Sequence, residues 1–191
     1  MSEKELDKKL LDVLGEYSKS FSNKEYVDEF NETDVLMDAF GITQDLKREN
    51  KQYWGRELGK CWESLLKTLF EATCDDFAPP KRFGADEPAD FFAGTDAIDT
   101  KYRVGSGDSG TLKKFESYGK LLQAEGYRPV SLFLRFDNLK AALSKMDAGG
   151  WTRFENDEAF EYIKEKTKFD LKAWLIKLSN SGSIKVNRDN G

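Results

Sequence analysis

The sequence contains no histidine, and this absence removes several classes of catalytic chemistry. Hydrolases with a serine–histidine or cysteine–histidine pair, histidine-ligated metal centres and nucleases with a histidine general base are all excluded. Two cysteines, Cys61 and Cys74, are too few for a four-thiolate zinc site. Their spacing on one predicted helix also argues against a disulfide, so we expect a reducing, cytoplasmic environment.

Long apolar runs are missing as well. No stretch approaches the roughly 18 consecutive apolar residues that suggest a membrane-spanning helix. The first five residues, Met1-Ser2-Glu3-Lys4-Glu5, lack the apolar core of a secretion signal. We therefore expect a soluble protein with no membrane partner, and its 191 residues are enough for one domain with a sizeable core.

The charge is acidic overall but unevenly distributed. The chain has 30 basic and 35 acidic residues, a net charge of −5, which at first sight disfavours a nucleic-acid partner. Residues 1–50 contain 7 basic and 13 acidic residues, whereas residues 101–145 contain 9 basic and 4 acidic residues. The second segment therefore carries the positive charge that phosphates require, and it predicts which half would face DNA.

Residues 1–50 are predicted to form a helical extension. Apolar residues recur at roughly helical spacing near its start, at Leu6, Leu10, Leu11, Val13 and Leu14. A shorter copy of the pattern covers residues 34–40. Two interpretations stay open, since the extension could be a solvated cap that packs on the main domain or a segment that dimerises or clasps DNA.

Residues 51–191 are predicted to form one α/β layered domain with a mixed sheet. The expected order is helix, hairpin, helix, strand, helix, strand and helix. The expected helices cover residues 52–73, 111–126 and 138–148, followed by a helical C-terminal part capped at Asn156 or Asp157. The expected strands cover residues 88–93, 96–104, 130–136 and 151–154, and residues 179–191 are expected to be frayed.

Two carboxylates and a lysine fall together on the predicted hairpin. If Gly94-Thr95 is a two-residue turn, Asp90 lies opposite Asp99, with Cβ atoms roughly 4.5–5.5 Å apart. Lys101 points to the same face as Asp99 because strand side chains alternate. Facing carboxylates repel unless a cation lies between them, and oxygen ligands favour a hard ion such as Mg²⁺. A lysine beside that ion can hold or deprotonate water and stabilise charge on a phosphate. The hairpin therefore predicts metal-dependent phosphodiester hydrolysis.

The Asp-x-Lys spacing is weak evidence by itself. It recurs at residues 7–9, 45–47 and 170–172, all in charge-rich helical stretches where such a pair is an ordinary solvated face. Only Asp99-Thr100-Lys101 lies on a predicted strand, follows an acidic strand and precedes a Gly/Ser loop. The competing interpretation of this copy is an exposed hairpin with a structural ion pair.

From residue 52 to residue 136 the chain resembles the PD-(D/E)xK nucleases, and among them the type II restriction endonucleases. The resemblance follows the order helix, hairpin with acids and lysine, helix, central strand. Asp90 corresponds to the first acid of the motif, although Ala89 stands where the family has proline and Pro88 is displaced by one. Asp99 and Lys101 correspond to the second acid and the lysine. The resemblance implies a restriction-endonuclease-like core, a mixed central sheet flanked by helices.

Other acidic residues could complete or replace this set. Family members often add a glutamate from the helix before the hairpin, and Glu63 matches that position best, with Glu57 in reserve. Asp96 or Asp86 could replace Asp90 if the turn is longer than two residues. The resemblance thus implies Asp90, Asp99 and Glu63 as metal ligands.

The function implied is a Mg²⁺-dependent endonuclease that cuts double-stranded DNA as a homodimer, most specifically a type II restriction enzyme. A structure-specific nuclease of the same superfamily, acting on junctions or in repair, is one alternative. A non-enzymatic DNA-binding module, in which the hairpin is merely structural, is another.

The Gly/Ser loop at residues 105–110 is the predicted DNA contact. Backbone N–H groups at a loop and helix start can grip a phosphate. The candidate DNA-binding residues are Ser106, Asp108, Ser109, Lys113 and Lys114. The loop lacks the Gly-Lys-Ser/Thr ending of a P-loop, so no nucleotide cofactor is expected. A flexible connector is the competing interpretation.

Overall fold

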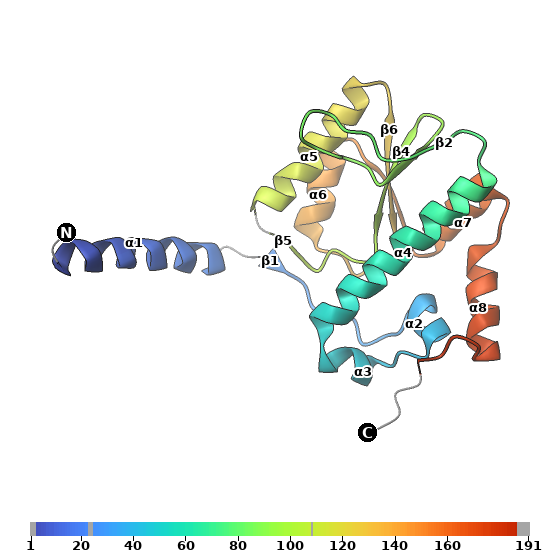
Figure 1. Cartoon of the computed structure of the whole chain (residues 1–191), viewed down its shortest axis with the longest axis horizontal. Coiled ribbons are helices and arrows are strands. Elements are labelled where there is room, and N and C mark those ends of the chain that lie inside the picture. The colour runs from blue at the N-terminus through green and yellow to red at the C-terminus, as the bar shows by residue number, and fades with distance from the viewer. Residues whose placement is uncertain (1–2, 23–24, 108, 187–191) are drawn as a thin grey trace.

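A mixed five-stranded open sheet flanked by helices forms the body of the protein (Figure 1). The computed structural model describes residues 3–22, 25–107 and 109–186. The helices are α1 (Glu3–Ser22), α2 (Val35–Phe40), α3 (Gln44–Glu49), α4 (Lys51–Thr73), α5 (Ser109–Ala124), α6 (Lys140–Ala148), α7 (Asp157–Thr167) and α8 (Leu171–Ser181). The strands are β1 (Glu25–Tyr26), β2 (Phe77–Ala78), β3 (Phe91–Ala93), β4 (Asp96–Lys101), β5 (Ser106–Gly107), β6 (Arg128–Phe133) and β7 (Thr152–Glu155). The predicted class, helices layered on a mixed sheet, is confirmed.

The large sheet has the strand order β2-β3-β4-β6-β7. Strands β3 and β4 form the antiparallel hairpin, while β4, β6 and β7 run parallel. The two-residue turn predicted at Gly94-Thr95 is confirmed, since Ala93 pairs with Asp96 and Phe91 pairs with Ile98. Gly94 has a φ of +58°, and a Cβ there would lie 2.6 Å from Asp76 Oδ2, so the turn requires glycine.

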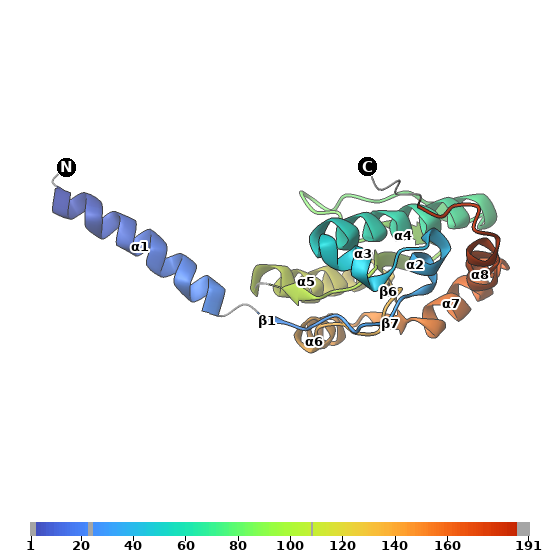
Figure 2. The same ribbon diagram turned by 90° about the horizontal axis from the view of Figure 1, so that it is seen from below.

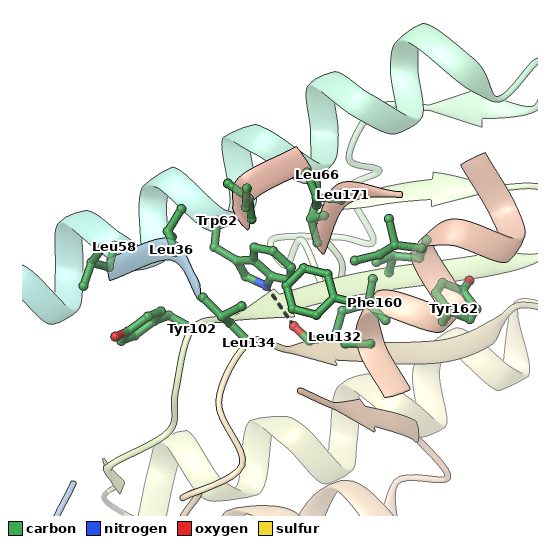
Figure 3. Packing of buried hydrophobic residues seen from close by; sticks show 14 of the residues in the cluster. Leu36, Leu58, Trp62, Leu66, Tyr102, Leu132, Leu134, Phe160, Tyr162 and Leu171 are labelled. Atoms are coloured by element: carbon green, nitrogen blue, oxygen red, sulfur yellow. Dashed lines mark hydrogen bonds between the residues drawn. The ribbon is translucent and has the colours of Figure 1, made fainter. Parts of the chain in front are cut away.

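Each face of the sheet has its own core. Figure 1 shows α5 and α6 on one side of the sheet and α4, α7 and α8 on the other. On the α4 side, Trp62 is fully buried, and its Nε1 donates to the carbonyl oxygen of Leu132 at 3.2 Å (Figure 3). Because side chains alternate along β4, Ile98 joins this core, whereas Ala97 joins the core under α5 and α6. Asp99 and Lys101 therefore belong to the α5 face.

Two sequence predictions about irregular segments are wrong. Residues 105–110 are not a continuous loop, because Ser106 and Gly107 form β5, which pairs with β1, and α5 already begins at Ser109. Residues 179–186 are not frayed, because α8 continues to Ser181 and the N–H of Val186 donates to the carbonyl oxygen of Phe40 at 2.9 Å. Residues 187–191 lie outside the described part of the chain.

The N-terminal 50 residues divide into two parts. Helices α2 and α3 pack on the body, and Leu36 and Met37 of α2 are buried in the same core as Trp62. Helix α1 instead extends away from the body (Figures 1 and 2), and its large apolar side chains between residues 10 and 17 are exposed. The interpretation of the extension as a packed cap therefore holds for α2 and α3 and is wrong for α1.

Candidate active site

The end of the hairpin borders a cavity of about 320 Å³ between the sheet and α5. Asp90, Asp99 and Lys101 line its sheet side. Thr111, Lys114, Phe115 and Tyr118 line it from α5. The ammonium Nζ of Lys101 lies 2.6 Å from Oδ1 of Asp99, and both side chains are largely buried. The fold thus brings three of the predicted site residues together beside a basic residue of α5.

Asp90 reaches the site by a different geometry from the one predicted. The regular pairing of β3 and β4 stops at Phe91 and Ile98, and the N–H of Asp90 bonds back to the carbonyl oxygen of Ile98 at 2.8 Å. This shift by one residue means that Asp90 does not pair directly with Asp99, which corrects the predicted register at that position. Instead, Oδ2 of Asp90 accepts hydrogen bonds from the backbone N–H and the hydroxyl of Thr100, at 2.6 and 2.7 Å.

The electrostatics of the site are those of crowded, partly desolvated carboxylates. Burial raises the pKa of Asp99 to about 6; Lys101 opposes this shift, and Asp90 adds to it. Burial by itself would lower the pKa of Lys101, but attraction to Asp99 and Asp90 outweighs burial and raises it. Lys101 is therefore held in its protonated form, while Asp99 retains a proton to an unusually high pH.

Glu63 approaches the cluster from another direction. It belongs to α4, which covers the face of the sheet opposite to Asp99 and Lys101. Partial burial raises the pKa of Glu63, Asp90 raises it further, and Lys101 opposes the shift. Glu63 is thus electrostatically linked to the site but does not line its cavity. The reserve residue, Glu57, forms surface ion pairs with Arg56 and Lys60 instead.

The carboxylates of Asp90 and Asp99 suit a hard divalent cation that takes only a few of its ligands from the protein. Within residues 3–22, 25–107 and 109–186, no group of three or more acidic, cysteine or histidine side chains is arranged to hold a metal ion. Asp90 and Asp99 remain as two neighbouring carboxylates. Mg²⁺ usually binds proteins through one or two carboxylates and completes its octahedron with water and substrate phosphates, so two carboxylates are enough.

The two substitutes considered for Asp90 have other partners. Asp96 lies at the far end of β4, where its carboxylate bonds Arg128 at 2.6 and 2.7 Å, Lys166 at 2.8 Å and the hydroxyl of Tyr162 at 2.7 Å. Asp86 accepts a hydrogen bond from the hydroxyl of Tyr118 at 2.6 Å. With the turn only two residues long, neither is needed in place of Asp90.

The candidate DNA-binding residues are spread along the start of α5. Lys114 lines the cavity, and its Nζ lies 5.9 Å from the ring centre of Tyr118, while Lys113 is exposed. Ser106 is exposed on β5. Asp108 and the side chain of Ser109 lie outside the described part of the chain.

Two residues of the site escaped sequence reasoning. Thr100 binds Asp90, and Tyr118 forms part of the cavity wall. No sequence pattern identifies Thr100, because its bond to Asp90 depends on the one-residue shift at Asp90. Tyr118 could have been found from its spacing, because it lies four residues after Lys114 on the same helix and so shares its face.

No known protein family, no curated protein and no solved structure matches the chain. Among the described residues, no helix is both long enough and apolar enough to cross a membrane.

Proposed function

We propose that the protein is a Mg²⁺-dependent endonuclease of the PD-(D/E)xK type that hydrolyses phosphodiester bonds in double-stranded DNA, as a type II restriction enzyme does. The observation that carries the proposal is the convergence of Asp90, Asp99 and Lys101 on one cavity whose opposite wall contributes Lys114. Two acids and a lysine serve phosphodiester hydrolysis without histidine, which this chain lacks.

The side chains have distinct roles in this reaction. Asp90 and Asp99 hold the magnesium ion, with Thr100 fixing the orientation of Asp90. When bound, the ion supplies positive charge for the scissile phosphate and lowers the pKa of its water. Lys101 is protonated, so it stabilises negative charge on the phosphate and orients the attacking water rather than removing its proton. Lys114 binds a DNA phosphate at the entrance, and Glu63 helps to keep Lys101 charged.

The test is digestion of a plasmid by the purified protein with Mg²⁺, followed by sequencing of the cut ends. Asp99→Asn or Lys101→Ala should reduce cleavage by at least about 100-fold, because the first weakens the metal site and the second removes positive charge placed at the reacting phosphate. Binding of the same DNA without Mg²⁺, measured by gel shift, should change little. Discrete fragments support a site-specific enzyme, and cutting of branched substrates alone indicates a junction or repair nuclease.

The chain supplies its own matched control. Asp170 and Lys172 have the same Asp-x-Lys spacing, but they lie at the start of α8, where Asp170 caps the helix. Asp170→Asn keeps a capping side chain, and Lys172→Ala removes a half-exposed ammonium that pairs with Asp157 of α7, away from the cavity, so both variants should cleave normally. Full Mg²⁺-dependent cleavage by Asp99→Asn or Lys101→Ala would refute the proposal, and binding without any cleavage would indicate a non-enzymatic DNA-binding module.

A further inference from the structure

Helix α1 exposes an apolar face that the body of the protein does not cover. It extends away from the sheet and its flanking helices (Figures 1 and 2). Five large apolar side chains on α1 are each between 50% and 64% exposed, namely Leu10, Leu11, Val13, Leu14 and Tyr17. A 20-residue helix is about 30 Å long and only marginally stable alone in water. The apolar face therefore calls for a partner that covers it.

The spacing of these residues is that of a helix that pairs with another helix. Leu10, Val13 and Tyr17 are separated by three and then four residues, which is the a/d spacing of a coiled-coil seam. Leu14 lies beside the seam and widens it. Such a stripe is typical of a contact with one further helix rather than burial against a sheet.

The charged residues beside the seam indicate which helix could pair with α1 and in which orientation. Lys9 and Glu16 are exposed, and each immediately precedes a seam residue, Leu10 and Tyr17 respectively. When two copies of α1 run antiparallel with Leu10 of one facing Val13 of the other, Lys9 of each lies beside Glu16 of its partner. A parallel pair would instead place Lys9 beside Leu14. The sequence of α1 is therefore complementary to itself in the antiparallel orientation.

A membrane surface suits α1 less well. Helices that bind anionic lipid carry a polar face rich in lysine and arginine. Helix α1 has four lysines and five acidic residues, a net charge of −1. This balance is what a helix pairing with its own copy needs, because two such helices do not repel each other strongly.

We propose that α1 is a self-association helix, and that two copies of the chain join through an antiparallel α1–α1 pair. Leu10 packs against Val13 of the other copy, and two symmetric ion pairs join Lys9 to Glu16. The two bodies are attached at opposite ends of this pair, so the dimer presents two copies of the cavity beside Asp99. This inference is independent of the proposed function, because the pairing depends only on α1.

The experiment measures the mass of the full chain by sedimentation equilibrium. The unaltered protein should be a dimer. Lys9→Glu and Glu16→Lys should each weaken the dimer, with Kd rising about tenfold, because each replaces two attractive contacts by two repulsive ones. The double variant, Lys9→Glu with Glu16→Lys, should restore the original Kd. Lys8→Glu makes the same charge change at an exposed position away from the seam, and it should leave Kd unchanged.

Each other outcome overturns the proposal. A monomeric unaltered protein refutes self-association, and its binding to vesicles with anionic lipid would identify a membrane surface as the partner instead. A double variant no tighter than the single variants refutes the antiparallel orientation. A dimer that survives Leu10→Asp refutes α1 as the interface. Because mass is the readout, failure of this inference is distinct from failure of the nuclease proposal.

Discussion

At the scale of single residues, Thr100 shows how a site can depend on a position that a motif leaves undefined. The Asp-x-Lys pattern specifies Asp99 and Lys101 but accepts many residues between them. Here that residue supplies two hydrogen bonds to one oxygen of Asp90, at 2.6 and 2.7 Å. With Oδ2 bound in this way, Oδ1 is the oxygen of Asp90 that we propose binds the metal ion. The sequence predicted the three motif residues, but it could not predict the role of Thr100, which depends on the one-residue shift at Asp90.

Thr100→Val should impair cleavage more than it impairs folding. Valine keeps the shape of threonine and the backbone N–H, but it removes the hydroxyl donor to Asp90. We expect a loss of about 1.5–3 kcal/mol in unfolding free energy, as for other hydrogen bonds to a charged group. Cleavage at low Mg²⁺ should fall about tenfold and recover at high Mg²⁺, because a poorly oriented Asp90 weakens the metal site. Thr100→Ser is the control, and equal Mg²⁺ requirements in both variants would contradict this role.

The raised pKa of Asp99 gives the reaction a pH dependence. Its pKa is about 6, so the carboxyl group is neutral below that pH and becomes a metal-binding carboxylate above it. At low Mg²⁺, cleavage should therefore increase as pH rises through about 6. Protons and Mg²⁺ compete for the same oxygens, so higher Mg²⁺ should move the midpoint of the pH–rate profile to lower pH. A midpoint that does not respond to Mg²⁺ would assign the titration to another group.

At the scale of helices and strands, segments with a strong apolar period or a clear turn could be predicted from the sequence. Segments whose structure depends on contact with a distant part of the chain could not. The apolar face of residues 52–73 predicted α4 to within one residue at its start, and the two-residue turn fixed the pairing of β3 with β4. In contrast, β1 and β5 are only two residues long, and each exists because it pairs with the other across about 80 residues of sequence. The exposed position of α1 could not be deduced either, since an amphipathic pattern does not say which surface the apolar face contacts.

Asp96 connects the sheet to α7 and should matter for stability rather than for catalysis. Although burial opposes the shift, bonds from Arg128, Lys166 and Tyr162 hold the pKa of Asp96 at about 2, below the ordinary 3.8. A lowered folded-state pKa stabilises the protein above pH 4, and this contribution is lost as pH falls toward 2. Asp96→Asn should therefore cost about 2 kcal/mol at pH 7, roughly half of that at pH 3 and little at pH 2, measured by urea unfolding. Loss of Mg²⁺-dependent cleavage per folded molecule would contradict this structural role.

At the scale of the whole molecule, counting charges along the chain overestimates the positive field near the site. Residues 101–145 carry a surplus of basic residues, but many of them bind acids within the fold. Arg103 and Arg135 both pair with Asp137, while Lys120 and Lys145 share Glu116. These pairs are invisible in the sequence because each depends on how the helices and strands pack. Among the described residues, the basic side chains of this segment without an ion pair are Lys113 and Lys114 on α5 and Lys140 at the start of α6.

Lys113 and Lys114 place two of these three charges at the start of α5. Within the described part of the chain, neither lysine forms an ion pair, and no acidic residue stands in the first turn of α5. Two lysines near the positive end of a helix dipole destabilise the helix slightly, and this cost is offset when a phosphate binds there. The start of α5 is therefore where we propose that a DNA phosphate binds.

Lys113→Ala and Lys114→Ala should each weaken binding of double-stranded DNA without altering which sequences are bound. Each phosphate contact contributes about 0.9 to the slope of log K against log salt concentration, so each variant should reduce the slope by about that amount. Lys177→Ala removes an exposed lysine of α8, a helix that packs on the opposite side of the sheet from α5, and it should leave the slope unchanged. Equal slopes in all three variants would show that DNA contacts a different surface, even if Asp99 and Lys101 prove essential for cleavage.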